Sequence, residues 1–285
     1  MDSVGPEQLV VLRFVPTLIF FIPIIFLFSR RQLRELSWRD RGWLLVLGIF
    51  GVGVYNISLN TGQTYIPASL AALVIALNPA SIAIFSAIVI KEKPPLRTWL
   101  GLAISFLGIT VVLLARGEMG KIDWRMLIGV LITLGAPVSW GVFTTGLRHF
   151  SQRYGAFLPV ALAMTYATLP LLFAPLFDPS LITISLHANP SLIWSVLFLA
   201  IACTVYGFSG WALVLKRVEA AKAGSFIYLV PLVAAFGSRW ILDEPLDLPL
   251  LFGALLVLAG VWTATGRKTQ FLSALVKYRS ENNSC

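Results

Sequence analysis

Nine apolar runs, each about 20 residues long, limit what this chain can fold into more than any other feature of its sequence. They span residues 8–28, 42–62, 67–90, 96–115, 126–147, 155–177, 192–215, 220–242 and 248–265. An α-helix of about 20 apolar residues crosses a hydrocarbon layer about 30 Å thick and satisfies its own backbone hydrogen bonds. The sequence therefore predicts an all-α polytopic membrane protein with nine transmembrane helices.

The composition and the short connectors leave no room for a soluble domain. Apolar residues make up 58% of the chain and charged residues 12%, far from the usual balance of a soluble protein. The connectors between the runs reach about 14 residues at most, which is too short for a further folded domain. The expected partners are the lipid bilayer and a small-molecule substrate.

The basic residues predict the orientation of the chain. If the connectors alternate between the two sides of the membrane, 17 of the 22 Lys and Arg residues fall on one side. The positive-inside rule makes that side the cytoplasm, so the C-terminus and the basic tail 266–285 are expected there. We therefore expect a multi-pass protein of the cell (inner or plasma) membrane. The net charge of +9 reflects this orientation, and no nucleic-acid partner is expected.

Residues 68–112 and 220–264 are two copies of one unit. A shift of 152 positions without a gap gives 11 identities in 45 aligned positions. These identities pair Pro79 with Pro231 and Glu92 with Glu244 in fixed register. Glu92 lies in a basic loop and Glu244 in a loop without basic residues, so the two copies are expected to face opposite sides. This pattern is typical of a transporter built from inverted-topology repeats.

The same shift leaves one helix without a counterpart. Residues 155–177 align with the first run of the chain, whereas 126–147 would align with positions before residue 1. The sequence thus predicts a first repeat of four helices at 1–115, lacking its first helix, and a second repeat of five helices at 126–265. A complete unit would have ten helices.

The chain resembles the EamA-type transporters of the drug/metabolite transporter superfamily. The resemblance is carried by PVSWGVF (137–143), by LRF (12–14), and by a mid-helix Pro, a Glu and a Gly-rich helix that follow one another in each copy. It implies a ten-helix fold of two repeats, of which nine helices are seen here. It also implies a permease or exporter of small metabolites, amino acids among them, and no cofactor.

Enzymatic machinery is not visible in the sequence. No zinc-protease motif, phosphate-binding loop or nucleophile elbow is present, and both histidines, His149 and His187, lie in connectors. All 13 Asp and Glu residues lie in loops or at helix ends, which argues against a carboxylate-driven proton pump. The chain is therefore predicted not to be an enzyme and to have no metal site.

The paired prolines give the strongest indication of a substrate site. Pro79 and Pro231 lie mid-helix at equivalent positions, and each removes one helical hydrogen bond. Paired breaks of this kind indicate a central cavity and its hinges, the alternative being kinks that serve packing alone. Asn78 and Tyr228 lie within one turn of these breaks. Asn56 and Asn60 share one helix face and are expected to line the same cavity, or else to bond neighbouring helices.

Three aromatic residues complete the predicted substrate site. Trp140, Tyr206 and Trp211 lie inside apolar runs, where they can stack on an organic substrate or pack in the core. Two arginines inside apolar runs, Arg13 and Arg239, can bind a substrate carboxylate or reach outward to the membrane surface.

Two further features concern packing. Gly101, Ser105 and Gly108 form a small-residue helix face that suits close contact within the fold or between the protomers of a homodimer. Glu92 and Glu244 are expected to cap or anchor the ends of the fourth helix of each repeat and to pair with neighbouring Lys or Arg.

The leading hypothesis is a secondary transporter that moves small organic metabolites by alternating access of its two repeats. The alternative is a non-transporting or regulatory membrane protein, or an inactive fragment that lacks the first helix.

Overall fold

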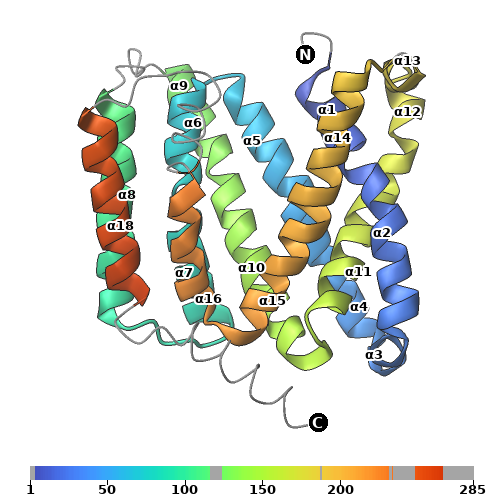
Figure 1. The fold of residues 1–285 in the computed structure, drawn as a ribbon, viewed down its shortest axis with the longest axis horizontal. Helices are drawn as coiled ribbons and strands as arrows, with labels where there is room; N and C mark the ends of the chain where they lie inside the picture. The colour runs from blue at the N-terminus through green and yellow to red at the C-terminus, as the bar shows by residue number, and fades with distance from the viewer. Residues whose placement is uncertain (1–3, 116–123, 187, 231–232, 234–247, 266–285) are drawn as a thin grey trace. The chain divides into compact units, whose positions relative to one another are not determined.

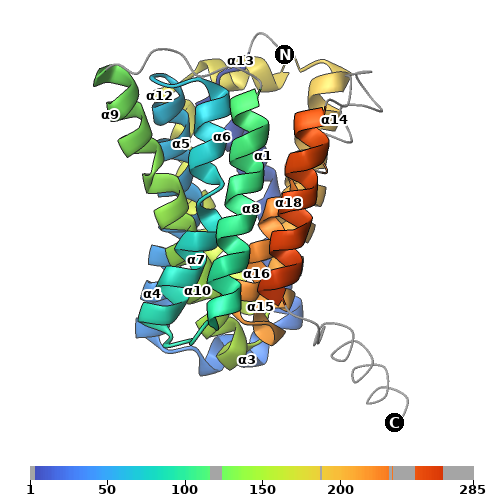
Figure 2. The same cartoon turned by 90° about the vertical axis from the view of Figure 1, so that its left-hand side faces the viewer.

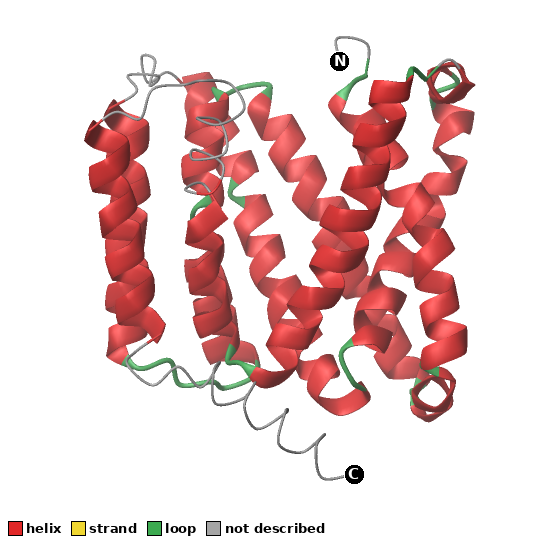
Figure 3. Ribbon diagram, in the orientation of Figure 1, coloured by secondary structure: helices red, strands yellow, loops and turns green. Residues whose placement is uncertain are grey.

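The computed structural model describes residues 4–115, 124–186, 188–230, 233 and 248–265. Every regular element among these residues is helical (Figure 3). Six helices in the described part of the chain are long and apolar enough to cross a membrane. They are Glu7–Leu27, Trp38–Gln63, Leu70–Val89, Trp124–Tyr154, Phe157–Phe177 and Pro190–Arg217, and two shorter apolar helices cover Leu96–Val111 and Leu251–Ala264. These eight helices agree with eight predicted runs; of the ninth, 220–242, residues 231, 232 and 234–242 lie outside the described residues.

The chain divides into two compact units. Unit 1 comprises Met1–Asn60 and Val142–Lys216, and unit 2 comprises Thr61–Gly141 and Arg217–Cys285. Each unit contains segments from both predicted repeats, 1–115 and 126–265. The repeats are therefore a feature of the sequence, whereas the units are a feature of packing, and each unit is described by itself below.

Unit 1 is built from helices that are interrupted repeatedly. Its elements are α1 (Pro6–Phe14), η1 (Val15–Thr17), α2 (Leu18–Pro23), η2 (Ile24–Phe28), α3 (Arg30–Glu35), α4 (Trp38–Gly48), η3 (Ile49–Val54), the start of α5 (Tyr55–Gln63), the end of α10 (Gly135–Tyr154), α11 (Phe157–Thr168), η4 (Leu169–Phe173), α12 (Ala174–Phe177), α13 (Ser180–Leu186), α14 (Pro190–Phe198), η5 (Leu199–Tyr206) and α15 (Gly207–Arg217). Segments η2, η3 and η5 are π-helical, and η1 and η4 are 3₁₀-helical. Helices α4 and α11 pack together in the core of unit 1. They approach so closely that a Cβ at Gly48 would overlap the carbonyl oxygen of Ala163.

Unit 2 contains a closely packed helix pair. Its elements are α6 (Ala68–Ile75), α7 (Asn78–Val89), α8 (Leu96–Ala115), α9 (Trp124–Thr133), the start of α10, α16 (Ala220–Ser225), η6 (Phe226–Tyr228) and α18 (Leu248–Thr265). Helices α8 and α18 lie side by side along their length (Figures 1 and 2).

Small residues set the distance between α8 and α18. A Cβ on Gly108 would lie 2.7 Å from the carbonyl oxygen of Gly253, and one on Gly260 would lie 2.6 Å from that of Gly101. Between these contacts, the Ser105 hydroxyl donates a hydrogen bond to the carbonyl of Val257 over 3.2 Å. The contacts run in opposite order along the two helices, so α8 and α18 are antiparallel. The small-residue face predicted at Gly101, Ser105 and Gly108 thus packs within the fold.

Segments related by the shift of 152 share the same irregularities. The span that starts at Trp38 is the counterpart of the span that starts at Pro190, and both change to a π-helix near their middle, at η3 and η5. The α6–α7 break at residues 76–77 has its counterpart in η6, where α16 gives way to a 3₁₀ turn. In unit 1, α4 begins at the lower edge of Figure 1 and α14 begins at the upper edge, so these two counterparts run in opposite directions.

Glu92 caps a helix, although not the one whose end it follows in the sequence. Its carboxylate accepts hydrogen bonds from the backbone N–H of Ala220, at 3.1 Å to Oε2 and 3.4 Å to Oε1. Ala220 is the first residue of α16, where unpaired N–H groups favour a negative charge. Glu244 lies outside the described residues.

Candidate functional site

The predicted site residues fall in both units. Asn78, Pro79, Trp140 and Tyr228 belong to unit 2, and Asn56, Asn60, Tyr206 and Trp211 belong to unit 1; Pro231, on the unit 2 side, lies outside the described residues.

The predicted break at Pro79 is present in unit 2. Helix α6 ends at Ile75 and α7 begins at Asn78, which places Pro79 in the first turn of a new helix. A proline there lacks only an N–H that the first turn would leave unpaired in any case. The chain crosses the break through a tight turn in which the Leu77 N–H bonds the Val74 carbonyl over 3.0 Å. The break is thus built into the span, as a hinge would require.

Two buried polar atoms lie just after this break. Asn78 is 4% exposed and Ser81, three residues later on the same face of α7, is also buried. Asn78 Oδ1 and Ser81 Oγ form no hydrogen bond with any described residue. Since buried polar atoms are nearly always paired, such a pair indicates a place where a bound molecule can supply partners. Ser81 was missed from the sequence, although its spacing from Asn78 is the signal that could have found it.

Gly141 lets helix α10 come close to the face of α7 that carries Asn78 and Ser81. A Cβ at Gly141 would overlap Ser81 Oγ and would lie 2.8 Å from the Phe85 ring. Trp140, the preceding residue, is partly buried. The PVSWG sequence therefore lets α10 come close to the polar face of α7.

Tyr228 lies in the core of unit 2. Its side chain is 1% exposed and belongs to a buried cluster with Ala83, Ala221 and Val257. These contacts favour a packing role for Tyr228 over a role in substrate binding.

In unit 1 the predicted polar residues follow the π segment η3. Asn56 Nδ2 donates a hydrogen bond of 2.7 Å to the carbonyl of Val52, one turn back in the same helix. The Val52 carbonyl also accepts the backbone N–H of Tyr55, so the amide adds a second hydrogen bond at the end of the π segment. Asn60, four residues on, is partly buried. The Asn56 amide thus bonds its own helix, an arrangement that the sequence did not indicate.

The predicted aromatic residues of unit 1 differ in exposure. Tyr206, the last residue of η5, is 72% exposed, whereas Trp211 on α15 is partly buried. The indole Nε1 of Trp211 is buried and has no hydrogen-bond partner among the described residues. Trp211 therefore keeps a donor available, which suits a binding role better than the exposure of Tyr206 does.

Arg13 is bonded to the π segment η5 of unit 1. Its Nε donates a hydrogen bond of 2.9 Å to Thr204 Oγ1 in η5, and its guanidinium lies 5.1 Å from the centre of the Phe14 ring. The Thr204 hydroxyl in turn donates to the Leu199 carbonyl, five residues back in the π segment, over 2.9 Å. Of the two sequence interpretations of Arg13, the outward reach does not fit this geometry.

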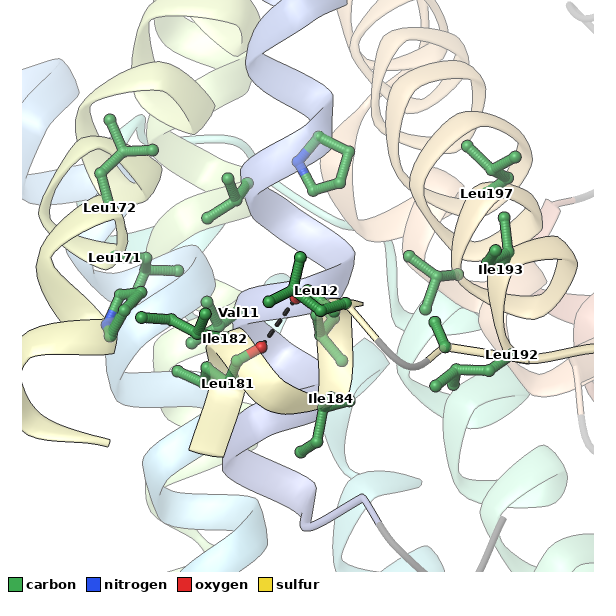
Figure 4. A pocket seen from close by; sticks show the side chains of 17 residues that line it. Val11, Leu12, Leu171, Leu172, Leu181, Ile182, Ile184, Leu192, Ile193 and Leu197 are labelled. Atoms are coloured by element: carbon green, nitrogen blue, oxygen red, sulfur yellow. Dashed lines mark hydrogen bonds between the residues drawn. The ribbon is translucent and has the colours of Figure 1, made fainter. Parts of the chain in front are cut away.

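Unit 1 also contains an apolar cavity of about 510 Å³ (Figure 4). Side chains of α1, η1, η4, α12, α13 and α14 line it, among them Leu12, Leu172 and Ile193. The hydroxyl of Ser185, a polar group in the lining, is already bonded to the Leu181 carbonyl over 2.7 Å. The cavity therefore offers apolar contact and little that could orient a polar metabolite.

Metal-binding chemistry has no candidate in the described residues. They contain no group of three or more His, Cys, Asp or Glu side chains placed to hold a metal ion.

Comparisons with known proteins agree on one family. The sequence matches the EamA-like transporter family over residues 1–114 and 127–266. An uncharacterized transporter from Archaeoglobus fulgidus is 30% identical over 264 residues, which cover 93% of this chain and 90% of that protein. A probable terminal-alkyne amino-acid exporter from Streptantibioticus cattleyicolor is 29% identical over 220 residues, or 76% of this chain and 71% of that protein.

A crystal structure of a protein that shares 24% sequence identity superimposes with a TM-score of 0.77. The match covers 92% of this chain and 88% of the other, and at that identity it shows the fold alone. The family match spans most of the sequence, and the described helices are those of a multi-pass membrane protein. This chain therefore belongs to the EamA-like transporter family.

Proposed function

We propose that this protein is a secondary transporter that moves small organic metabolites, amino acids among them, by alternating access of two inverted repeats. The observation that carries the proposal is the duplication of irregular structure at a shift of 152. Both copies have a π segment in one span and a break in another, at η3 and η5 and at residues 76–77 and η6. Irregular helices at equivalent places in two halves are the pattern from which transporters build a substrate path.

Two further observations support inverted topology. The counterparts α8 and α18 pack antiparallel in unit 2, and the counterparts α4 and α14 run in opposite directions within unit 1. With 17 basic residues assigned to one side, the C-terminus lies in the cytoplasm and the protein lies in the cell membrane.

The substrate class rests on relatives and on the polar groups described above. One relative is named a probable amino-acid exporter, and amino acids need hydrogen-bonding groups inside the membrane. Asn78, Trp140 and Tyr228 in unit 2, and Asn56, Asn60, Tyr206 and Trp211 in unit 1, are the proposed substrate contacts. Pro79 and Pro231 are the proposed hinges. The exposed Tyr206 and the closely packed Tyr228 are the members of this set that the structure supports least.

The test is efflux from proteoliposomes loaded with labelled amino acids, sugars and organic cations. Saturable flux of one class is expected, and its response to an imposed pH gradient identifies proton coupling. A well-folded protein that moves no member of the panel would contradict the proposal and favour a non-transporting role.

A further inference from the structure

We propose that Arg13 binds a negatively charged group of the transported metabolite, a carboxylate in the case of an amino acid. This inference rests on the transport function proposed above, and it adds a substrate class and a residue outside the predicted site. It follows from four observations in unit 1, which concern the charge balance of Arg13, its free donors, its depth and its neighbours.

The first observation is a positive charge without a counter-ion. Arg13 lies on α1 inside the span Glu7–Leu27, and none of the ion pairs of the described residues includes it. A charged side chain within a membrane span is costly unless it is paired or hydrogen-bonded, and such residues usually mark substrate or ion pathways. A single neutral hydroxyl, that of Thr204, is a weak partner for a full charge.

The second observation concerns the donors that remain. The bond to Thr204 uses Nε only, so both terminal NH₂ groups of the guanidinium are free of hydrogen bonds to the described residues. The hydroxyl and the neighbouring Phe14 ring fix the plane of the guanidinium. Two parallel N–H groups held in one plane match the two oxygens of a carboxylate, and such bidentate pairs are among the strongest charge-assisted hydrogen bonds.

The third observation is depth. Thr204 is buried near the middle of the 28-residue span Pro190–Arg217, within the π segment η5. The hydrogen bond therefore draws the guanidinium inward, away from the surface to which a snorkelling arginine extends.

The fourth observation is the polar surroundings. Cys203 of η5 and Tyr55, which directly follows η3, are neighbours of the Arg13 guanidinium. Arg13 thus bonds to a residue of one π segment, η5, and lies near the residue that follows the other, η3. Such π segments occur frequently at functional sites.

The experiment compares an amino acid that the wild type transports with its uncharged carboxamide analogue. Arg13→Gln is expected to raise the KM for the acid about tenfold or more, and to change the KM for the amide much less. Arg13→Lys keeps the positive charge but lacks the planar guanidinium. Its KM for the acid should therefore lie between those of the wild type and of Arg13→Gln. Arg31→Gln is the matched control, because Arg31 lies on α3 with its side chain 91% exposed and paired to Glu35.

Thr204→Val provides a second variant if Arg13→Gln does not fold. It leaves the charge in place but removes the hydroxyl that orients it, and a several-fold rise in KM for the acid alone is expected. Equal increases in the KM for the acid and for the amide, or an unchanged KM for the acid, would overturn the inference and leave Arg13 with a structural role.

The headgroup of an anionic lipid could also satisfy the guanidinium, so each assay is run in zwitterionic phosphatidylcholine vesicles with and without anionic phosphatidylglycerol. A tenfold effect that is the same in both supports a substrate site. An effect that appears only with the anionic lipid would assign Arg13 to a headgroup instead. The wild type is assayed with the whole panel before any variant is made. If it transports no member of the panel, the proposed function fails, and this outcome is distinct from a failure of the Arg13 inference.

Discussion

Helices α8 and α18 in unit 2 meet backbone to backbone over Gly101, Gly108 and Gly260, whereas the spans that start at Trp38 and Pro190 in unit 1 are each interrupted by a π segment. The first pair is held by van der Waals packing and by two hydrogen bonds from hydroxyls to carbonyls. In the second region, Asn56 and Thr204 donate hydrogen bonds to backbone carbonyls, and Arg13 donates one to Thr204. The close packing of α8 and α18 suits a scaffold, whereas the interrupted spans of unit 1 belong to the region where we propose that substrate binds.

The largest expected effect is on the scaffold. Gly260→Ala should lower the free energy of unfolding by about 3 kcal/mol, because the new Cβ would lie 2.6 Å from the Gly101 carbonyl oxygen and the helices must separate. The measurement is thermal unfolding in detergent. Gly210→Ala on α15 is the matched control, since a Cβ there meets nothing within 4 Å, and this variant should be neutral or slightly stabilised. Equal stability of the two variants would mean that α8 and α18 do not pack as described.

The next prediction separates binding from packing within unit 2. Asn78→Leu should reduce transport about tenfold while leaving the melting temperature unchanged or raised, because the Asn78 oxygen has no partner to lose. Flux in proteoliposomes and thermal unfolding are measured on the same preparation. A large fall in the melting temperature would show that Asn78 has a packing role instead. Normal flux would remove it from the site.

The π segment of unit 1 gives a smaller effect on stability. Asn56→Leu should cost about 1 kcal/mol, because the hydrogen bond from the Asn56 amide to the Val52 carbonyl is lost. Asn60→Leu, on the same helix face, removes no hydrogen bond formed within the described residues and serves as the control. The measurement is unfolding by titration with a denaturing detergent. If both variants behave alike, the Asn56 amide does not stabilise the π segment.

The smallest effect is electrostatic and lies at the outer ends of the helices of unit 1. Hydrogen bonds from Ser180 and from Gln8, the latter 2.9 Å long, hold the pKa of Asp178 below its ordinary value of 3.8. The carboxylate is favoured in the folded state, so its contribution is present above the ordinary pKa and is lost as pH falls through the lowered value. The melting temperature of the wild type should thus decline slightly more below about pH 4 than that of Asp178→Asn. Parallel curves would contradict this.

Several parts of the fold could be predicted because hydropathy and spacing are local. Eight of the predicted spans have helical counterparts, and the break at Pro79 lies where the proline indicates. The candidate site was less accessible to prediction. Ser81 and Thr204 are ordinary hydroxyls in apolar runs, and nothing in their own segments says which helix they face. Arg13 was visible, but its direction depended on a hydroxyl 191 positions away.

The sequence alone determined that this chain spans a membrane, that it contains two copies of one unit and that it belongs to a transporter family, because apolar length, fixed-register identities and family motifs need no knowledge of contacts. Only the tertiary structure decided which helices pair. It combined segments of both repeats in each compact unit, and it packed the small-residue face of α8 against α18. In lipid, every helix is apolar on the outside, so hydropathy cannot choose partners, and shape and individual hydrogen bonds make the choice.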